Sequence, residues 1–166
     1  MENYSVLMSV YYKEQAENLR EAIDSILNQT VKTNEFIIVK DGPLTEKLDN
    51  TIKEYVEEYP GVFKIVTLKK NMGLAKALNK GIEQCSNEII ARMDSDDISM
   101  PDRMERQLEA MEANRADILS GAIVEFDESV DKPTAKRELP EKNEQIIEFA
   151  KKRSPFNHPA VMYKKS

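Results

Sequence analysis

The chain has 166 residues, the length of one domain, and a domain of this size buries roughly 70% of the surface that its unfolded chain exposes. Its 24 Lys and Arg against 30 Asp and Glu give a net charge of −6 without a long block of like charges, so nucleic acid is not an expected partner. A single cysteine, Cys85, excludes a disulfide within the chain, and no apolar run reaches the ~20 residues that span a bilayer. We therefore expect a cytoplasmic protein, while attachment to the inner face of a membrane through a segment outside these residues stays open.

Strand-like and helix-like patterns alternate along the chain, which is typical of strand–helix–strand units around a parallel sheet. Apolar residues at helical spacing predict helices, and continuous or alternating apolar runs predict strands. Residues 127–140 are polar and contain two prolines, so we expect a loop there, then a helix over 141–152 and a short strand-like run near the end. Without an internal repeat, residues 1–166 are predicted to form one α/β domain. The earlier strands are expected at 4–10, 36–39, 62–68, 88–93 and 117–126, and the earlier helices around 19–27, 48–59, 74–85 and 101–114.

Polar residues stand where several of the expected strands end. In an open, mostly parallel sheet, ligands bind outside the carboxyl ends of the strands, so these residues are expected at one edge of the sheet. Asp41 also has a purely structural interpretation, because an aspartate before Gly-Pro is a common turn residue. The residues at the ends of the first, second and fourth strands are Ser9 and Tyr11, Asp41, and the cluster Asp94, Asp96 and Asp97.

The aspartate cluster can be interpreted in two ways. Ser99 and Asp102 fit a capping box at the start of a helix, with Pro101 in its first turn, but this leaves the aspartates upstream unexplained. Closely spaced carboxylates favour a cation, and a set of oxygen ligands suits Mg²⁺ or Mn²⁺, whereas Zn²⁺ prefers Cys and His. Such an ion completes its shell with substrate phosphates, so a di- or triphosphate is expected. The chain has no glycine-rich phosphate loop, so the metal must neutralise the phosphates.

Five segments together resemble family 2 glycosyltransferases that use nucleotide sugars: SVLMSVYYKE, VKDGP, NMGLAKALNKGI, MDSDDISMPDRM and NHPAVMYKK. They occur in the order and at the intervals of that family, across essentially the whole chain. The resemblance implies the GT-A fold, a Rossmann-like α/β/α arrangement in three layers with a mostly parallel central sheet flanked by helices. It also implies transfer of a sugar, with inversion, from a nucleoside-diphosphate sugar to a saccharide or lipid-linked acceptor in cell-surface polysaccharide synthesis.

The resemblance assigns roles to the residues at the sheet edge. Ser9 and Tyr11 would flank the nucleotide base and ribose, and Asp41 would bond the base. For Tyr11 a packed aromatic, and for Ser9 a plain strand-end hydroxyl, stay open as alternatives. The acids of the D-x-D motif are Asp94, expected near the ribose or the metal-bound phosphate, and Asp96, expected on Mn²⁺ or Mg²⁺ with Asp97 as a second candidate ligand.

Some positions depart from the family pattern or stay open. Lys40 stands where many relatives have an acid, and Leu78 stands where they often have an arginine, so Lys76 is a speculative substitute with a solvated lysine as its alternative. His158 is equally a donor or metal contact or a loop residue without special role.

The chain resembles the donor-binding N-terminal half of the family, and the general base is expected beyond Ser166. A nucleotide-sugar-binding module without transferase activity is the alternative function. A sugar-nucleotide pyrophosphorylase is another, although it should carry a glycine-rich basic loop where this chain has SVYYKEQAEN.

Overall fold

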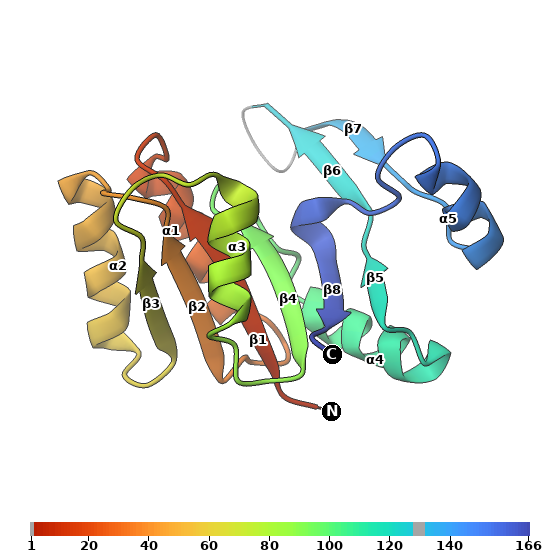
Figure 1. The fold of residues 1–166 in the computed structure, drawn as a ribbon, viewed down its shortest axis with the longest axis horizontal. Coiled ribbons are helices and arrows are strands. Elements are labelled where there is room, and N and C mark those ends of the chain that lie inside the picture. Colours follow the sequence, from red (N-terminus) through yellow and green to blue (C-terminus); the bar gives the residue numbers. More distant parts are fainter. Residues whose placement is uncertain (1, 128–131) are drawn as a thin grey trace.

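A six-stranded sheet runs through the centre of the computed structural model, which describes residues 2–127 and 132–166 (Figure 1). Its strand order is β3-β2-β1-β4-β8-β5. The first four of these are parallel, and β8 runs antiparallel to both β4 and β5. The mostly parallel sheet predicted from the sequence is thereby confirmed. The strands are β1 (Tyr4–Val10), β2 (Glu35–Lys40), β3 (Phe63–Thr67), β4 (Ile89–Asp94), β5 (Ile118–Ser120) and β8 (Val161–Lys164).

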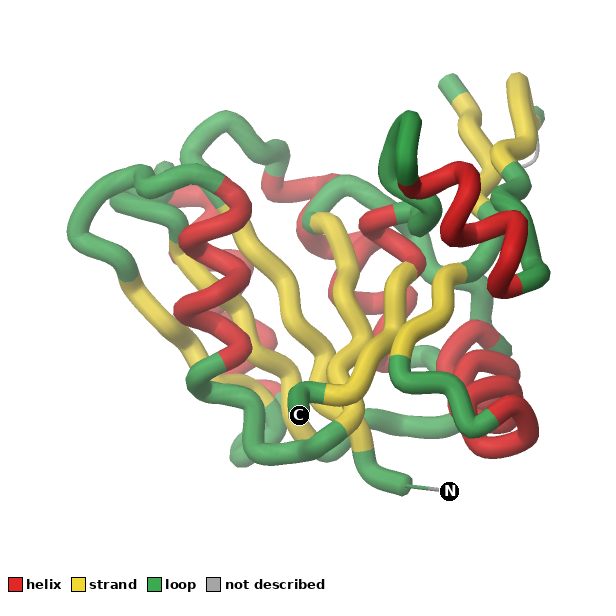
Figure 2. Tube along the Cα trace, turned by 45° about the vertical axis from the view of Figure 1, so that its right-hand side comes forward, coloured by secondary structure: helices red, strands yellow, loops and turns green. Residues whose placement is uncertain are grey.

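Helices cover both faces of the sheet, as Figure 2 shows. Side chains alternate along β1, so that Val6 and Met8 join a large apolar cluster with α1 (Ala16–Leu27), α2 (Glu46–Glu58) and α4 (Arg103–Asn114). Leu7 points the other way, into a smaller cluster beneath α3 (Leu74–Ile82). Because both faces are covered, the strands are nearly continuous apolar runs, and the expected three-layer α/β/α architecture is confirmed.

The expected strand over 117–126 is wrong, because two strands of different sheets share that segment. After β5 the chain leaves the main sheet, and β6 (Ile123–Phe126) pairs with β7 (Pro133–Arg137) in a separate two-stranded sheet. The break falls at Gly121, whose N–H donates to the Ala160 carbonyl at 3.0 Å and whose carbonyl accepts from Asn157 Nδ2 at 2.9 Å. A distant segment therefore takes the backbone groups that would continue the strand.

The expected loop over 127–140 is wrong in part, since β7 lies within it; its residues 128–131 lie outside the described residues. All residues of β7 are exposed, so the strand shows no alternation of apolar and polar residues that sequence could reveal. The expected helix over 141–152 is confirmed as α5 (Asn143–Ala150), although none of its residues is buried. None of the helices in the described residues has both the length and the apolarity that crossing a membrane requires.

The start of α4 corrects another expectation. Ser99 and Asp102 do not form a capping box: Asp102 precedes the helix without a side-chain capping bond, and Ser99 Oγ accepts a hydrogen bond from Gln29 Nε2 at 3.2 Å. Gln29, at the end of α1, caps α4 instead, since its Oε1 accepts from the Met104 N–H at 3.0 Å. A buried side chain from the segment after α1 thus replaces the local cap.

The order of the strands creates a crevice between β1 and β4. The chain runs from β1 to β2 on one side of the sheet, whereas β4 lies on the other side of β1, so the loops that follow β1 and β4 diverge. Ser9 is paired in register with Asp94, and Val10 with Lys40 directly before Asp41. The carboxyl ends of these strands therefore meet where the sequence predicted a site.

Candidate functional site

A cleft of about 490 Å³, lined mostly by polar residues, lies at this crevice between β1 and β4. It is lined by the ends of β1 and β4, the loop after β1, and the loop before α3. Several predicted residues line it together, namely Ser9, Tyr11, Asp41, Asp94 and Asp96. The other predicted residues, Asp97, Lys76 and His158, are not part of its lining. A further polar cleft of about 360 Å³, at Asn34 and Asn87, lies at the opposite edge and contains none of the predicted residues.

Asp41 holds the wall of the cleft in place. Its carboxylate is buried, and it accepts hydrogen bonds from the Met72 N–H at 2.7 Å and the Gly73 N–H at 3.0 Å. Gly42, the next residue, has φ of 90°, and a Cβ there would lie 2.5 Å from Asn71 N. Asp41 therefore holds the loop before α3, a structural contact that differs from the turn role expected before Gly42-Pro43. Its contact with a base stays a prediction, and each oxygen keeps a second lone pair for a ligand.

The loop over residues 94–97, called the acidic loop below, places its three carboxylates in different surroundings. Asp94, at the end of β4, is half-buried, Asp96 is exposed, and Asp97 is half-buried. Burial, together with the charges of Asp94 and Asp96, raises the pKa of Asp97 to about 6. Burial also raises the pKa of Asp94, although Arg92 opposes this. Asp94 and Asp97 thus each lie close to other negative charges, which a bound cation would offset.

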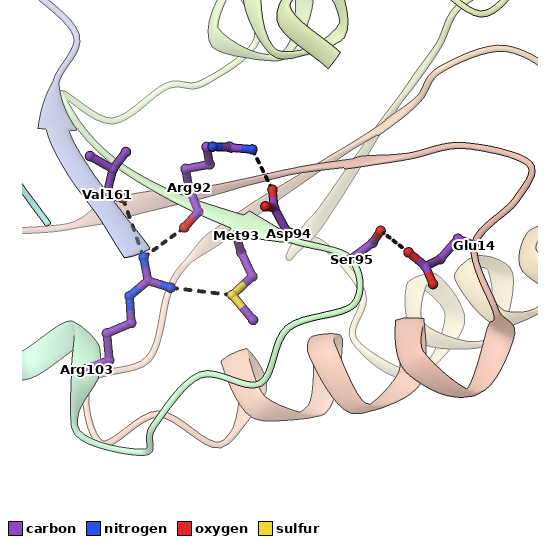
Figure 3. A network of polar contacts seen from close by, with 7 residues as sticks. All are labelled: Glu14, Arg92, Met93, Asp94, Ser95, Arg103 and Val161. Atoms are coloured by element: carbon purple, nitrogen blue, oxygen red, sulfur yellow. Dashed lines mark hydrogen bonds and ion pairs between the residues drawn. The ribbon is translucent and has the colours of Figure 1, made fainter. Parts of the chain in front are cut away.

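Two arginines near Asp94, the buried Arg92 and the half-buried Arg103, were missed by the sequence analysis (Figure 3). Arg92 Nη2 donates to Asp94 Oδ1 at 2.7 Å. Arg103, at the start of α4, donates to the Arg92 carbonyl at 2.8 Å and to Gln107 Oε1 at 3.0 Å, and burial lowers its pKa to about 10, so it stays charged at neutral pH. The chain thus supplies part of the positive charge that the aspartates require. The signal was present in the sequence, because Arg92 interrupts the apolar strand IIARMD and a buried charge needs a partner.

Glu14 connects the loop after β1 to the acidic loop, and it was missed as well. Ser95, between Asp94 and Asp96, is buried, and its Oγ donates to Glu14 Oε2 at 2.6 Å (Figure 3). Glu14 Oε1 in turn accepts from the Gln15 N–H at 2.8 Å. Both Glu14 and Ser95 line the cleft, so one carboxylate sets the spacing between its two walls.

The sequence matches the family model described as Glycosyl transferase family 2 over residues 5–165. The chain belongs to this family. A family 2 relative, the amylovoran biosynthesis glycosyltransferase AmsE of Erwinia amylovora, is 44% identical over 163 residues, which are 98% of this chain and 60% of that protein. The UDP-Gal:alpha-D-GlcNAc-diphosphoundecaprenol beta-1,3-galactosyltransferase of Escherichia coli is 41% identical over 163 residues, 98% of this chain and 58% of that protein. The chain therefore spans about 60% of the length of these relatives.

Solved glycosyltransferase structures share the fold. S. aureus TarS 1–349 in complex with UDP superposes with a TM-score of 0.68 at 18% identity, covering 98% of this chain and 47% of that one. The mannosyltransferase PcManGT from Pyrobaculum calidifontis, in complex with GDP-Man and Mn²⁺, gives a TM-score of 0.65 at 18% identity, covering 98% and 44%. The GT-A fold expected for a family 2 glycosyltransferase is confirmed by these similarities.

Positions where this family 2 glycosyltransferase departs from the family pattern have local explanations. Lys40 pairs with Asp49 of α2, with 2.5 Å between Nζ and Oδ1, so it holds a helix rather than a ligand. Lys76 is exposed in the first turn of α3. His158 is exposed, and its Nε2 lies 3.1 Å from Ser154 Oγ. For Lys76 and His158 a role in ligand binding stays a prediction.

The acids of the cleft could bind a divalent cation only if water or a ligand completed its coordination. Among the residues that the structure describes, no group of three or more His, Cys, Asp or Glu side chains is arranged to hold a metal ion. Asp94 and Asp96 line the same cleft, offer only oxygen atoms, and carry mutually repelling charge. This set of atoms fits Mg²⁺ or Mn²⁺, which are usually bound through one or two carboxylates and complete their coordination with water and phosphate oxygens.

Proposed function

We propose that this chain is the donor-binding domain of a metal-dependent glycosyltransferase. It would transfer a sugar, with inversion, from a nucleoside-diphosphate sugar to a saccharide or lipid-linked acceptor in cell-surface polysaccharide synthesis. The observation that carries the proposal is the meeting of Ser9 and Tyr11 with Asp94 and Asp96 in one cleft at the switch point of the sheet. The relatives named for amylovoran biosynthesis and for galactosyl transfer to a diphosphoundecaprenol-linked sugar support the acceptor class.

Different residues of the cleft would contact different parts of the sugar donor. Tyr11, with 42% of its surface exposed, offers its ring to the base, and Ser9 lies beside it. Asp41 would add an acceptor for the base. Asp94 would contact the ribose or the metal-bound phosphate, and Asp96, with Asp97 as a second ligand, would hold Mn²⁺ or Mg²⁺. When bound, that ion would stabilise the negative charge that develops on the departing diphosphate.

The proposal assigns neither the acceptor-binding site nor the general base to these residues. The general base that deprotonates the acceptor hydroxyl is assigned to no residue of this chain. We further propose that residues 1–166 act as one unit in the cytoplasm, peripheral to the inner face of the membrane where a lipid-linked acceptor would be met. The lipid-linked substrate for which the E. coli relative is named supports this placement.

Calorimetry with UDP and with GDP, in Mn²⁺ and in chelator, tests the proposal. One of the two nucleotides should bind at least about tenfold more tightly with Mn²⁺ than with chelator, since the ion bridges the carboxylates and the diphosphate. Asp96→Ala should remove this difference while leaving the unfolding midpoint unchanged. Asp102→Ala is the matched control, because Asp102 is a nearby, half-exposed acid outside the cleft, paired with Arg106 at 3.5 Å. Equal affinity in Mn²⁺ and in chelator would contradict the proposal.

A further inference from the structure

We infer that Arg92 is a positioning residue for donor binding, one that acts by holding the Asp94 carboxylate at the edge of the cleft. The inference rests on the proposed function, because the orientation of Asp94 matters only if the cleft receives a nucleotide. Arg92 does not itself line the cleft, so it would act through Asp94 and not through the ligand.

Arg92 and Asp94 are two residues apart on β4, so their side chains leave the same face of the sheet. The register pairs Arg92 with Leu7, which belongs to the cluster beneath α3, and Asp94 with Ser9, which lines the cleft. The Arg92 guanidinium therefore reaches along the strand, from the covered part of the sheet toward its carboxyl edge, and meets Asp94 Oδ1 at 2.7 Å (Figure 3).

Burying the Arg92 guanidinium costs desolvation free energy, which a residue needed only for packing would avoid by being apolar. Arg92 is 6% exposed, and its Nε has no hydrogen-bond partner within the described part of the chain. Among the described residues, Asp94 is the only ion-pair partner of Arg92. An apolar side chain at such a position is often as stable as a buried ion pair, or more so, so the contact is better explained by what it does to Asp94.

The contact fixes one oxygen of Asp94 and leaves the other for a ligand. Arg103 fixes the strand from behind, through its hydrogen bond to the Arg92 carbonyl at 2.8 Å. Without the Arg92 guanidinium, the Asp94 carboxylate could rotate freely and would face Asp96 and Asp97 with less compensating charge. Donor binding would then have to order this carboxylate as well, which lowers affinity.

A double-mutant cycle separates this role from a merely structural one. Arg92→Met, Asp94→Asn and the double variant are made in the longest natural form of the chain and titrated with UDP and GDP in Mn²⁺. Each single variant should weaken binding at least about tenfold, the loss expected for one charge-assisted hydrogen bond. The double variant should bind within about threefold of Asp94→Asn, because Arg92 has no effect once its partner is gone. Should Arg92→Met fail to fold, Arg92→Lys replaces it in the cycle, since lysine keeps the charge without the planar donor geometry.

Glu35→Gln is the control, since Glu35 lies at the amino end of β2, away from the cleft, and nucleotide affinity should not change. Unchanged affinity in the Arg92 variant, or a double variant that shows the full product of both single losses, would overturn the inference and leave the proposed function standing. A wild-type chain that binds neither nucleotide would overturn the proposed function and this inference with it.

Discussion

Asp41 shows how one side chain can serve both the fold and the site at the scale of a single residue. Because its two oxygens accept from the Met72 and Gly73 N–H groups, we expect Asp41→Asn to leave one of these donors facing an amide NH₂ group. The free energy of unfolding, measured by urea titration, should fall by about 1–3 kcal/mol. The matched control is Asp117→Asn, whose exposed carboxylate pairs with Lys164 on the surface, and its effect should stay within about 0.5 kcal/mol. A similar loss of unfolding free energy in both variants would contradict the structural role of the Asp41 hydrogen bonds.

Gly42 contributes through its backbone to the same corner of the cleft. Gly42 and Gly61 both have positive φ, 90° and 84°, but only at Gly42 would a Cβ meet other atoms, 2.5 Å from Asn71 N and 2.9 Å from the Lys70 carbonyl carbon. Gly61→Ala therefore measures the strain of the dihedral alone, about 1 kcal/mol. Gly42→Ala should lower the unfolding midpoint clearly further, because backbone must move. Equal unfolding midpoints for the two variants would show that the close approach at Gly42 does not affect stability.

Sequence reasoning placed the residues that strands deliver to the site, and it missed those that tertiary contacts bring there. Ser9, Asp41 and Asp94 follow directly from the rule that parallel strands end at one edge of a sheet. The contact between Glu14 and Ser95 joins residues 81 positions apart, and no local pattern announces it. The charge balance of the acidic loop was misjudged in the same way, because Arg103 reaches it only after α4 has packed against the sheet.

At the scale of elements, the start of α4 and the segment before it depend on Gln29, which directly follows the C-cap of α1. Gln29 is fully buried, and its Nε2 donates to the Ser25 and Met100 carbonyls, each at 2.8 Å, while its Oε1 accepts from the Met104 N–H. Gln29→Ala should destabilise the protein by more than about 2 kcal/mol in urea unfolding, because several buried backbone groups lose their partner at once.

Asn28→Ala is the control for this prediction, since Asn28 is the neighbouring exposed residue at the end of α1. It should unfold almost as wild type does, within about 0.5 kcal/mol. A loss at Asn28 that matches the loss at Gln29 would mean that the end of α1 matters and the cap on α4 does not. The capping box expected at Ser99 failed for the same reason: a cap supplied by a distant segment leaves no trace in the local sequence.

At the scale of the whole molecule, the main sheet was predictable and the region after it was not. Residues 4–94 alternate between apolar strands and amphipathic helices, so periodicity alone gives their order and layers. After α4, the sheet is completed by β8, a strand from the far end that inserts between β4 and β5. Such a long-range insertion depends on the tertiary structure, which explains why β5 and β6 were expected to be one strand.

The candidate binding cleft lies at the carboxyl ends of the strands, whereas Glu35 lies at the amino end of β2, where its contacts are structural. Burial raises the pKa of Glu35, but hydrogen bonds from Ser5 and Ser86 outweigh it and leave the pKa below its usual value. A lowered pKa means that Glu35 stabilises the fold above the unfolded-state pKa near 4.5 and that this stabilisation is lost as the pH falls through the folded-state value. Glu35→Gln should therefore be less stable than wild type by about 1 kcal/mol at pH 7, and the two stabilities should converge as the pH falls through the folded-state pKa of Glu35, which lies below 4.5. A gap that persists at low pH would show that shape, and not charge, accounts for the role of Glu35.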